Sequence, residues 1–231
     1  MGRVLPKLRP TSNQYGRDVT GRIPSADAVV GVNALPPSHD AIWKLAAPYL
    51  SVRNNDEHTI YAYGIAQALT DLHPGCDPEV VLPAILLHDT GWSQAPQDEV
   101  LTAIAPGGGR PDLVLLHEKE GARIAREILT RLGHDATRAE EVVAIIDGHD
   151  SRVEALSLND ALVKDADKLW RLTTHGVDTV MEWFGLSRDE AHRLIGSRVH
   201  GHLFTDVAGT MARVLAAAAW VDASPQRVAL G

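Results

Sequence analysis

The chain has 231 residues, of which 45% are hydrophobic and 23% charged, a composition that excludes fibrous, collagenous and wholly disordered proteins. Its formal net charge of −8 argues against general nucleic-acid binding, which needs an excess of Lys and Arg to displace phosphate counterions. Cys76 is the single cysteine, so no intramolecular disulfide can form, and we expect a reducing, cytoplasmic environment. No apolar run approaches the roughly 18 residues of a membrane span, so we expect no membrane association.

The first part of the chain differs from the rest in its pattern. Proline and glycine recur through residues 1–37 without a hydrophobic period, which predicts an extended N-terminal arm. From residue 38 onward the pattern is helical. We therefore expect one domain over 38–231, with a motif-bearing core at 56–172 and further helices at 173–231.

The first expected helices follow from apolar spacing and from end signals. Apolar residues three and four positions apart predict helices over 40–50 and 56–72. Asp77 as N-cap, with Pro78 at the first helical position, predicts a third helix that Gly91 closes. A short helix over 97–105 and a loop over 105–112 precede a long helix over 113–132, which ends at Gly133.

Two expected capping boxes mark helices further along the chain. Thr137 with Glu140 begins a helix that runs to about residue 148, and Ser187 with Glu190 begins another over 187–195. Periodic apolar residues predict two more helices over 159–172 and 206–221. Since no stretch alternates with period two, the predicted fold class is all-α, with eight or nine helices around one core.

The dipeptide His-Asp occurs four times, at 39/40, 88/89, 134/135 and 149/150. The pair His88-Asp89 differs in its setting, because it ends an almost wholly apolar helix and is followed closely by Gly91. Adjacent helical positions diverge by about 100°, so the two side chains converge only where the helix is ending. A buried, charged Asp89 at that place needs a partner, and a metal ion would supply one.

Five segments together resemble the HD-domain superfamily of metal-dependent phosphohydrolases. They are DEHTIYAYGIAQAL with His58, AILLHDTGW with His88 and Asp89, LLHEKEGARIAREILTRLG with His117, AIIDGHDS with His149, and LVKDADKLW with Asp167. Their order and spacing match over 56–172, about half the chain. The resemblance implies an HD-type helical bundle in which six side chains hold metal.

The resemblance assigns these six side chains to two metal ions that share Asp89. One ion would take His58, His88 and Asp167, and the other His117 and His149. Asp165 competes for the last ligand position, but the family places its ligand in an Ala-Asp-x-Leu setting, which favours Asp167. Imidazole and carboxylate donors without thiolate suit two open sites for Fe, Mn, Co or Ni better than a closed structural zinc site.

Other side chains near the motifs are expected to support this centre. Arg152, Lys168 and Arg171 are expected anchors for a substrate phosphate. Trp92 stands where many family members carry Lys or His, and we expect an apolar or stacking wall there. Glu118 and Asp165 are expected to orient imidazoles. The other histidines receive no role: His39, His73, His134, His175, His192, His200 and His202.

The leading functional hypothesis is a hydrolase of a small phosphorylated compound, either a phosphomonoester or a nucleotide. A metal-activated hydroxide would attack phosphorus at a centre in which His88 and Asp89 are catalytic. An HD-fold mixed-valent diiron oxygenase that acts on a small polar substrate would use the same six ligands. A regulatory module whose metal only holds helices together is the third hypothesis. The oligomeric state stays open.

Overall fold

The computed structural model describes residue 16, residues 19–29, residue 31 and residues 35–228. Two units are distinguished, Met1–Leu35 and Pro36–Gly231. In the first unit the described residues include two short 3-10 helices, Thr20–Arg22 and Ala26–Ala28. Of the arm expected at 1–37, residues 1–15, 17–18, 30 and 32–34 lie outside the described residues, and the last residue, Pro37, begins the first α-helix.

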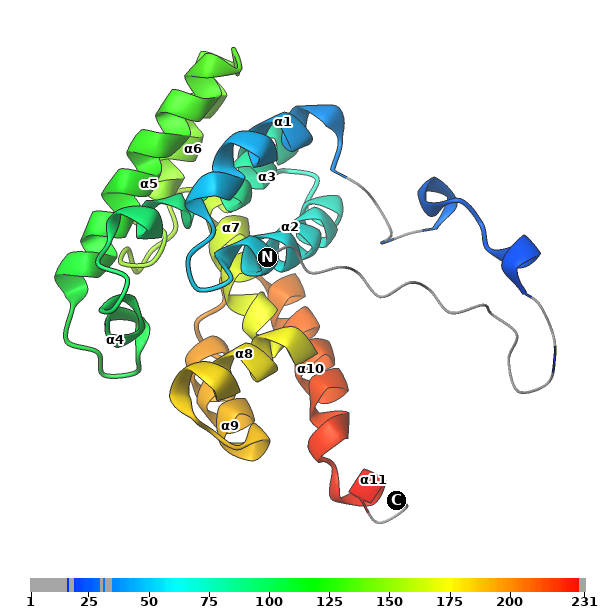
Figure 1. Ribbon diagram of the computed structural model, residues 1–231. Helices are drawn as coiled ribbons and strands as arrows, with labels where there is room; N and C mark the ends of the chain where they lie inside the picture. Colours follow the sequence, from blue (N-terminus) through cyan, green and yellow to red (C-terminus); the bar gives the residue numbers. More distant parts are fainter. Residues whose placement is uncertain (1–15, 17–18, 30, 32–34, 229–231) are drawn as a thin grey trace. The chain divides into compact units, whose positions relative to one another are not determined.

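In the second unit, every regular element among the described residues is helical, which confirms the expected all-α fold class (Figure 1). The first helices are α1 (Pro37–Ala46), α2 (Asn55–Asp71), α3 (Pro78–Leu87) and the short α4 (Val100–Ile104). The next are α5 (Pro111–Arg131), α6 (Ala136–Ile146) and α7 (Leu158–Leu169). The C-terminal helices are α8 (Thr174–Phe184), α9 (Arg188–Val199), α10 (Asp206–Trp220) and α11 (Pro225–Val228). Within the described ranges, no helix combines the length and the apolar character needed to cross a membrane.

Helix α3 lies at the centre of the second unit. Every residue from Val80 to Leu87 is buried, and α3 packs against α1, α2, α6 and α7. A helix that is apolar on all sides is stable only when other elements surround it. Its start is fixed by Asp77, whose side chain accepts a hydrogen bond from the Glu79 amide at 3.0 Å. The last turn of α3 therefore delivers the residues that follow it into the protein interior.

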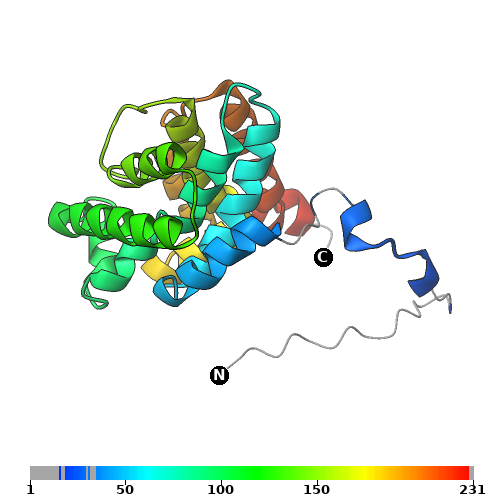
Figure 2. The ribbon, with the colours of Figure 1, turned by 90° about the horizontal axis from the view of Figure 1, so that it is seen from above.

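Helices α5 and α6 lie side by side in both views (Figures 1 and 2). The segment that follows α3 packs closely on α5, and it is a 3-10 helix over Thr90–Gln94. Gly91 makes this approach possible, because a Cβ built there would overlap the His117 carbonyl oxygen and lie 2.5 Å from the Gly121 amide nitrogen. The expectation that Gly91 closes α3 was therefore wrong: the glycine lies inside the next helix, where it allows close packing.

The two expected capping boxes had different outcomes. The box of Ser187 and Glu190 is confirmed at the start of α9. The box of Thr137 and Glu140 is not formed, because α6 begins earlier, at Ala136. Asp135 is its N-cap and accepts a hydrogen bond from the Arg138 amide at 3.0 Å.

Helix α8 was not expected from the sequence. Thr173 caps its start by accepting a hydrogen bond from the Gly176 amide at 3.0 Å, and Gly185 ends it with a φ of 64°. Four of its residues, among them Val177 and Val180, are buried. Its β-branched threonines and valines have low intrinsic helix propensity, so tertiary packing stabilises a helix that local preference does not favour.

Candidate metal centre

Three helices bring the first group of His and Asp side chains together. His58 comes from α2, His88 follows the end of α3, and Asp167 comes from the last turn of α7, and all three are buried. The Nε2 atoms of His58 and His88 are 3.0 Å apart. Oδ1 of Asp167 lies 3.3 Å from the first of these nitrogens and 3.6 Å from the second. The three donors therefore surround one small volume.

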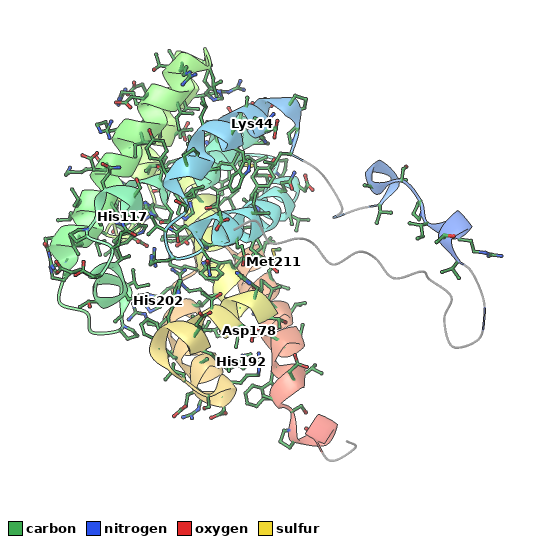
Figure 3. The ribbon with its side chains drawn as sticks, viewed as in Figure 1. Lys44, His117, Asp178, His192, His202 and Met211 are labelled. Carbon is green, nitrogen blue, oxygen red and sulfur yellow. The ribbon has the colours of Figure 1, made fainter. Side chains whose placement is uncertain are left out.

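A second group lies beside the first. His117 comes from α5 (it is labelled in Figure 3) and His149 follows α6, and their Nε2 atoms are 3.4 Å apart. Oδ2 of Asp150 is 3.4 Å from Nε2 of His117. Oδ1 of Asp89 lies 3.7 Å from Nε2 of both His88 and His149 and 4.0 Å from that of His117. Asp89 thus stands between the two groups.

Two histidines are oriented by the helix that each of them ends. Nδ1 of His88 donates to the carbonyl oxygen of Ile85 at 2.8 Å, and Nδ1 of His149 donates to that of Ile146 at 3.0 Å. Each carbonyl belongs to the residue three positions earlier. In the neutral ring, a proton held on Nδ1 leaves Nε2 unprotonated and directed at the centre, which is the tautomer that a metal ligand needs.

Asp150 was not expected among the site residues. It belongs to the fourth His-Asp dipeptide, His149-Asp150, which follows α6 as His88-Asp89 follows α3. The signal was present in the sequence, because both pairs follow apolar helical stretches. In both cases the regular helix has ended before the pair, at Leu87 and at Ile146, so that two adjacent side chains can point to one place.

Burial and charge set the protonation of the centre. Burial, and to a smaller extent the neighbouring His149, lower the pKa of His117 to about 4. Burial also lowers the pKa of His149, but Asp150 and Asp89 outweigh it and bring the pKa to about 9. Burial raises the pKa of Asp89, yet His88 and His149 hold it well below its usual range. The Asp89 carboxylate is therefore ionised.

The donor set fits divalent transition-metal ions. Three overlapping triads, His58/His88/Asp167, His88/Asp89/His149 and His117/His149/Asp150, each place one ligand atom per residue within 4.8 Å of the others. Two ligands on adjacent corners of an octahedral ion with bonds of about 2.1 Å lie about 3.0 Å apart, and tetrahedral ligands lie about 3.4 Å apart. The nitrogen–nitrogen distances of 3.0 and 3.4 Å match these separations.

Of the two candidates for the last ligand position, Asp165 and Asp167, only Asp167 lies beside the histidines. Asp167 faces the centre, whereas Asp165 accepts hydrogen bonds from the amides of Phe204 at 2.8 Å and Thr205 at 3.1 Å. It also accepts one from the Thr205 hydroxyl at 2.9 Å. Asp165 therefore fixes the start of α10 to α7, and it does not orient an imidazole as we had expected.

Glu118 also acts at a different place from the one expected. Its Oε1 accepts hydrogen bonds from the amides of Asp150 at 2.9 Å and Ser151 at 2.7 Å, and its Oε2 accepts one from the Ser151 hydroxyl at 2.7 Å. The carboxylate therefore holds the main chain of the loop that carries His149 and Asp150, not an imidazole ring.

Lys164 supports the same loop from α7, and the sequence had not singled it out. It is 2% exposed, and its Nζ donates to the carbonyl oxygens of Gly148 at 3.0 Å, His149 at 2.8 Å and Arg152 at 2.8 Å. An ammonium group has three donors, and all three are used here. Lys164 is thus a positioning residue for the second group of donors.

The structure does not bring Arg152 to the centre. Its guanidinium donates to the carbonyl oxygens of Ala144, Ile145 and Asp147 at 3.2, 3.2 and 2.9 Å, and to Oδ2 of Asp160 at 3.3 Å. These carbonyls belong to the C-terminal end of α6, where unpaired oxygens and the helix dipole attract cations. Arg152, which we expected to anchor a phosphate, instead caps the C-terminal end of α6.

Trp92 and Arg171 do lie at the centre. Nε1 of Trp92 donates to Oδ1 of Asp89 at 3.1 Å, and the indole stacks on the His117 ring at a centroid distance of 3.9 Å. Trp92 therefore holds two of the proposed ligands, and its expected role as a wall against the substrate stays a prediction. Nη1 of Arg171 lies 3.6 Å from Oδ2 of Asp167.

Arg53 is a cation that the sequence analysis missed. Its guanidinium carbon lies 5.0 Å from the centroid of the Trp92 ring and 5.3 Å from that of Trp183. Arg53 and Asn54 both have positive φ, 54° and 60°, so a left-handed turn immediately before α2 directs the side chain inward. Together with Arg171 it lines a small cavity of about 30 Å³ that reaches His58, Asp89 and Asp150.

The geometry defines an all-helical protein with a buried centre of imidazoles and carboxylates. A family model described as HD domain matches residues 55–172, about half of the chain, and the chain belongs to this family. No curated protein matched. The crystal structure of a predicted HD superfamily hydrolase from an uncultured Thermotogales bacterium is similar in fold, with 19% sequence identity and a TM-score of 0.57. The match covers 83% of this chain and 92% of that one.

Proposed function

We propose that this protein is a metal-dependent hydrolase of a small phosphorylated compound, a phosphomonoester or a nucleotide. The observation that carries the proposal is the centre itself, in which four histidines and three aspartates form three overlapping triads with ligand atoms within 4.8 Å of one another. The domain would extend over 38–231, with the family core inside it. The similarity of fold to a predicted HD superfamily hydrolase supports the same class of reaction.

The proposed ligands divide between two ions of Fe, Mn, Co or Ni. His58, His88 and Asp167 would hold one ion, His117 and His149 the other, and Asp89 would serve both, with Asp150 as a further donor to the second. Divalent ions in such a centre supply a Lewis acid and lower the pKa of water toward neutrality. In the hydrolysis a water oxygen bonds to phosphorus, the ester P–O bond breaks, and the leaving oxygen takes up a proton.

The protein's own side chains bind and orient the substrate. Arg171 and Arg53 both line the small cavity, and their positive charges would neutralise phosphoryl oxygens there. Lys168 lines the larger adjoining cavity and adds a third positive charge. Trp92 keeps Asp89 and His117 in place through a hydrogen bond and a stacked ring. Because these groups are held before substrate arrives, little reorganisation is needed.

Turnover on a defined panel tests the proposed reaction. Protein loaded separately with Mn, Co, Ni or Fe should release inorganic phosphate from at least one compound in a panel of nucleotides, sugar phosphates and aryl phosphates. Chelation should stop the release, and adding back the metal should restore it. Absence of phosphate release with every metal would contradict the proposal, and oxygen uptake by an iron-loaded sample would point to an oxygenase. Unfolding on chelation without any reaction would point to a structural metal.

The number of ions is a separate prediction. We expect two metal ions per chain, because seven donors that include two histidine pairs exceed what one ion with an open position can take. A crystal of metal-loaded protein, measured at the absorption edge of the metal, should give two anomalous peaks. A single peak at full occupancy, with His117 and His149 more than about 3 Å from it, would contradict the prediction, since imidazole ligands bond at about 2.1 Å.

A further inference from the structure

A larger cavity adjoins the metal centre and is distinct from it in chemistry. It has a volume of about 410 Å³, and Asp150, Asp167 and Arg171 line both this cavity and the small cavity at the centre. A volume of this size is typical of a site for a small organic molecule. The two cavities share a wall, so a molecule could occupy both at once.

One wall of the larger cavity is apolar. It is lined by Val180, Trp183, Phe184, Leu194, Ile195 and Val199. Val180, Ile195 and Val199 are buried, 3%, 2% and 1% exposed, so they form a firm inner surface. A surface of this kind stabilises an apolar group and gives a polyol no partners for its hydroxyls.

This wall comes from a different part of the chain than the proposed ligands. All its apolar members belong to α8 and α9, which follow the segment 55–172 that matches the family. The two helices pack on each other, and Arg188 forms an ion pair with Asp178, which is labelled in Figure 3. The family segment thus carries the proposed ligands, and the following helices carry the apolar wall.

Positive charge lies beside the apolar wall. Lys168, Arg171 and Arg198 line the same cavity, together with His202, to which the sequence gave no role. Trp183 lines both cavities and lies 6.2 Å from the Trp170 ring by centroid distance, so an aromatic surface continues from the centre into the larger cavity. A ligand that fits both cavities has an anionic head near the arginines and a flat apolar body on Trp183.

We propose that α8 and α9 form the specificity compartment of this protein and that its substrate is an aryl or similarly flat, apolar phosphate ester. The inference rests on the proposed function for the position of the phosphoryl group. It adds that the organic part of the substrate is bound by Trp183 and the residues around it. Trp183 is the specificity-determining residue, and a flat apolar ester is favoured over a small polyol phosphate because it buries more apolar area against this wall.

Binding of phosphonates tests the compartment without requiring turnover, because the carbon–phosphorus bond is not hydrolysed. Isothermal titration calorimetry of the Mn-loaded protein should give at least about tenfold tighter binding of phenylphosphonate than of methylphosphonate, as expected for burial of one phenyl ring. Trp183→Ala should reduce this ratio to about threefold or less. Leu194→Gln, on the other helix of the wall, should also reduce it.

A matched control and two contrary outcomes complete the test. Trp43→Ala removes an equally large ring from α1 that lines neither cavity, so the ratio should stay as in the unchanged protein. Circular dichroism checks that each variant is folded, and Leu194→Gln remains informative if Trp183→Ala is not. Equal affinity for the two phosphonates, or no binding of either, would overturn the compartment. Preferential binding of phenylphosphonate without phosphate release from any ester would instead contradict the proposed function and leave the compartment standing.

Discussion

Replacing the central pair, His88→Ala together with Asp89→Asn, should remove metal from the protein and lower phosphate release by at least about a thousandfold. His88 belongs to two of the three overlapping triads, and the carboxylate oxygens of Asp89 lie within 4.0 Å of donor nitrogens in both groups, so the double replacement affects both groups. Metal content measured by inductively coupled plasma mass spectrometry should fall to less than one ion per chain. The rate of phosphate release measures the second effect.

The same dipeptide elsewhere in the chain offers a matched control. His134 and Asp135 are also adjacent, but they lie at the surface between α5 and α6, away from the centre. His134→Ala together with Asp135→Asn keeps an N-cap residue for α6 and should leave metal content and rate unchanged. Equal losses in the two paired variants would show that the effect comes from the fold and not from the proposed ligands.

Lys164→Met should lower the free energy of unfolding by about 3 kcal/mol, because it leaves three carbonyl oxygens around a buried site without their charged donor. These carbonyls belong to Gly148, His149 and Arg152, in the loop that carries the second group of donors. We also expect a 10- to 100-fold loss of metal affinity at that group, typical for residues that position ligands. Urea unfolding and metal titration measure the two effects.

Lys168→Met is the control for this variant, since Lys168 lies one turn further along the same helix. Its ammonium group contacts a single carbonyl oxygen, that of Lys164, at 3.3 Å. Its loss should change the unfolding free energy by less than about 1 kcal/mol and leave metal affinity intact. If Lys168→Met destabilises the protein as much as Lys164→Met does, the three carbonyl contacts are not the cause.

The helices could be predicted where their signals are local. Ser187 and Glu190 mark the start of α9 within four residues, and Gly133 follows the end of α5, so short-range chemistry was sufficient. Gly91 and α8 could not be predicted in this way. The glycine looks like a helix stop until α5 is known to lie against it, and α8 is stabilised by packing with α9 and α10.

The same distinction applies to the centre. The resemblance named His58, His88, His117 and the other proposed ligands because each lies in a recognisable segment. Asp150 could be assigned only once α6 was seen to end at Ile146, before His149, since adjacent positions within a helix cannot converge. Arg152 was misassigned because a nearby cation can serve a helix end as well as a substrate, and only the carbonyl contacts distinguish the two.

The rings of His88 and His149 each donate a hydrogen bond to the main-chain carbonyl three positions earlier. This limits how mutation can alter the orientation of the two rings. The acceptors are main-chain atoms of Ile85 and Ile146, so no side-chain replacement at either position removes them. Many metal proteins hold such a ring with a carboxylate that one substitution deletes. Here the orientation of the rings is set by the helical main chain. Substitutions at neighbouring positions leave it unchanged as long as α3 and α6 end at the same residues.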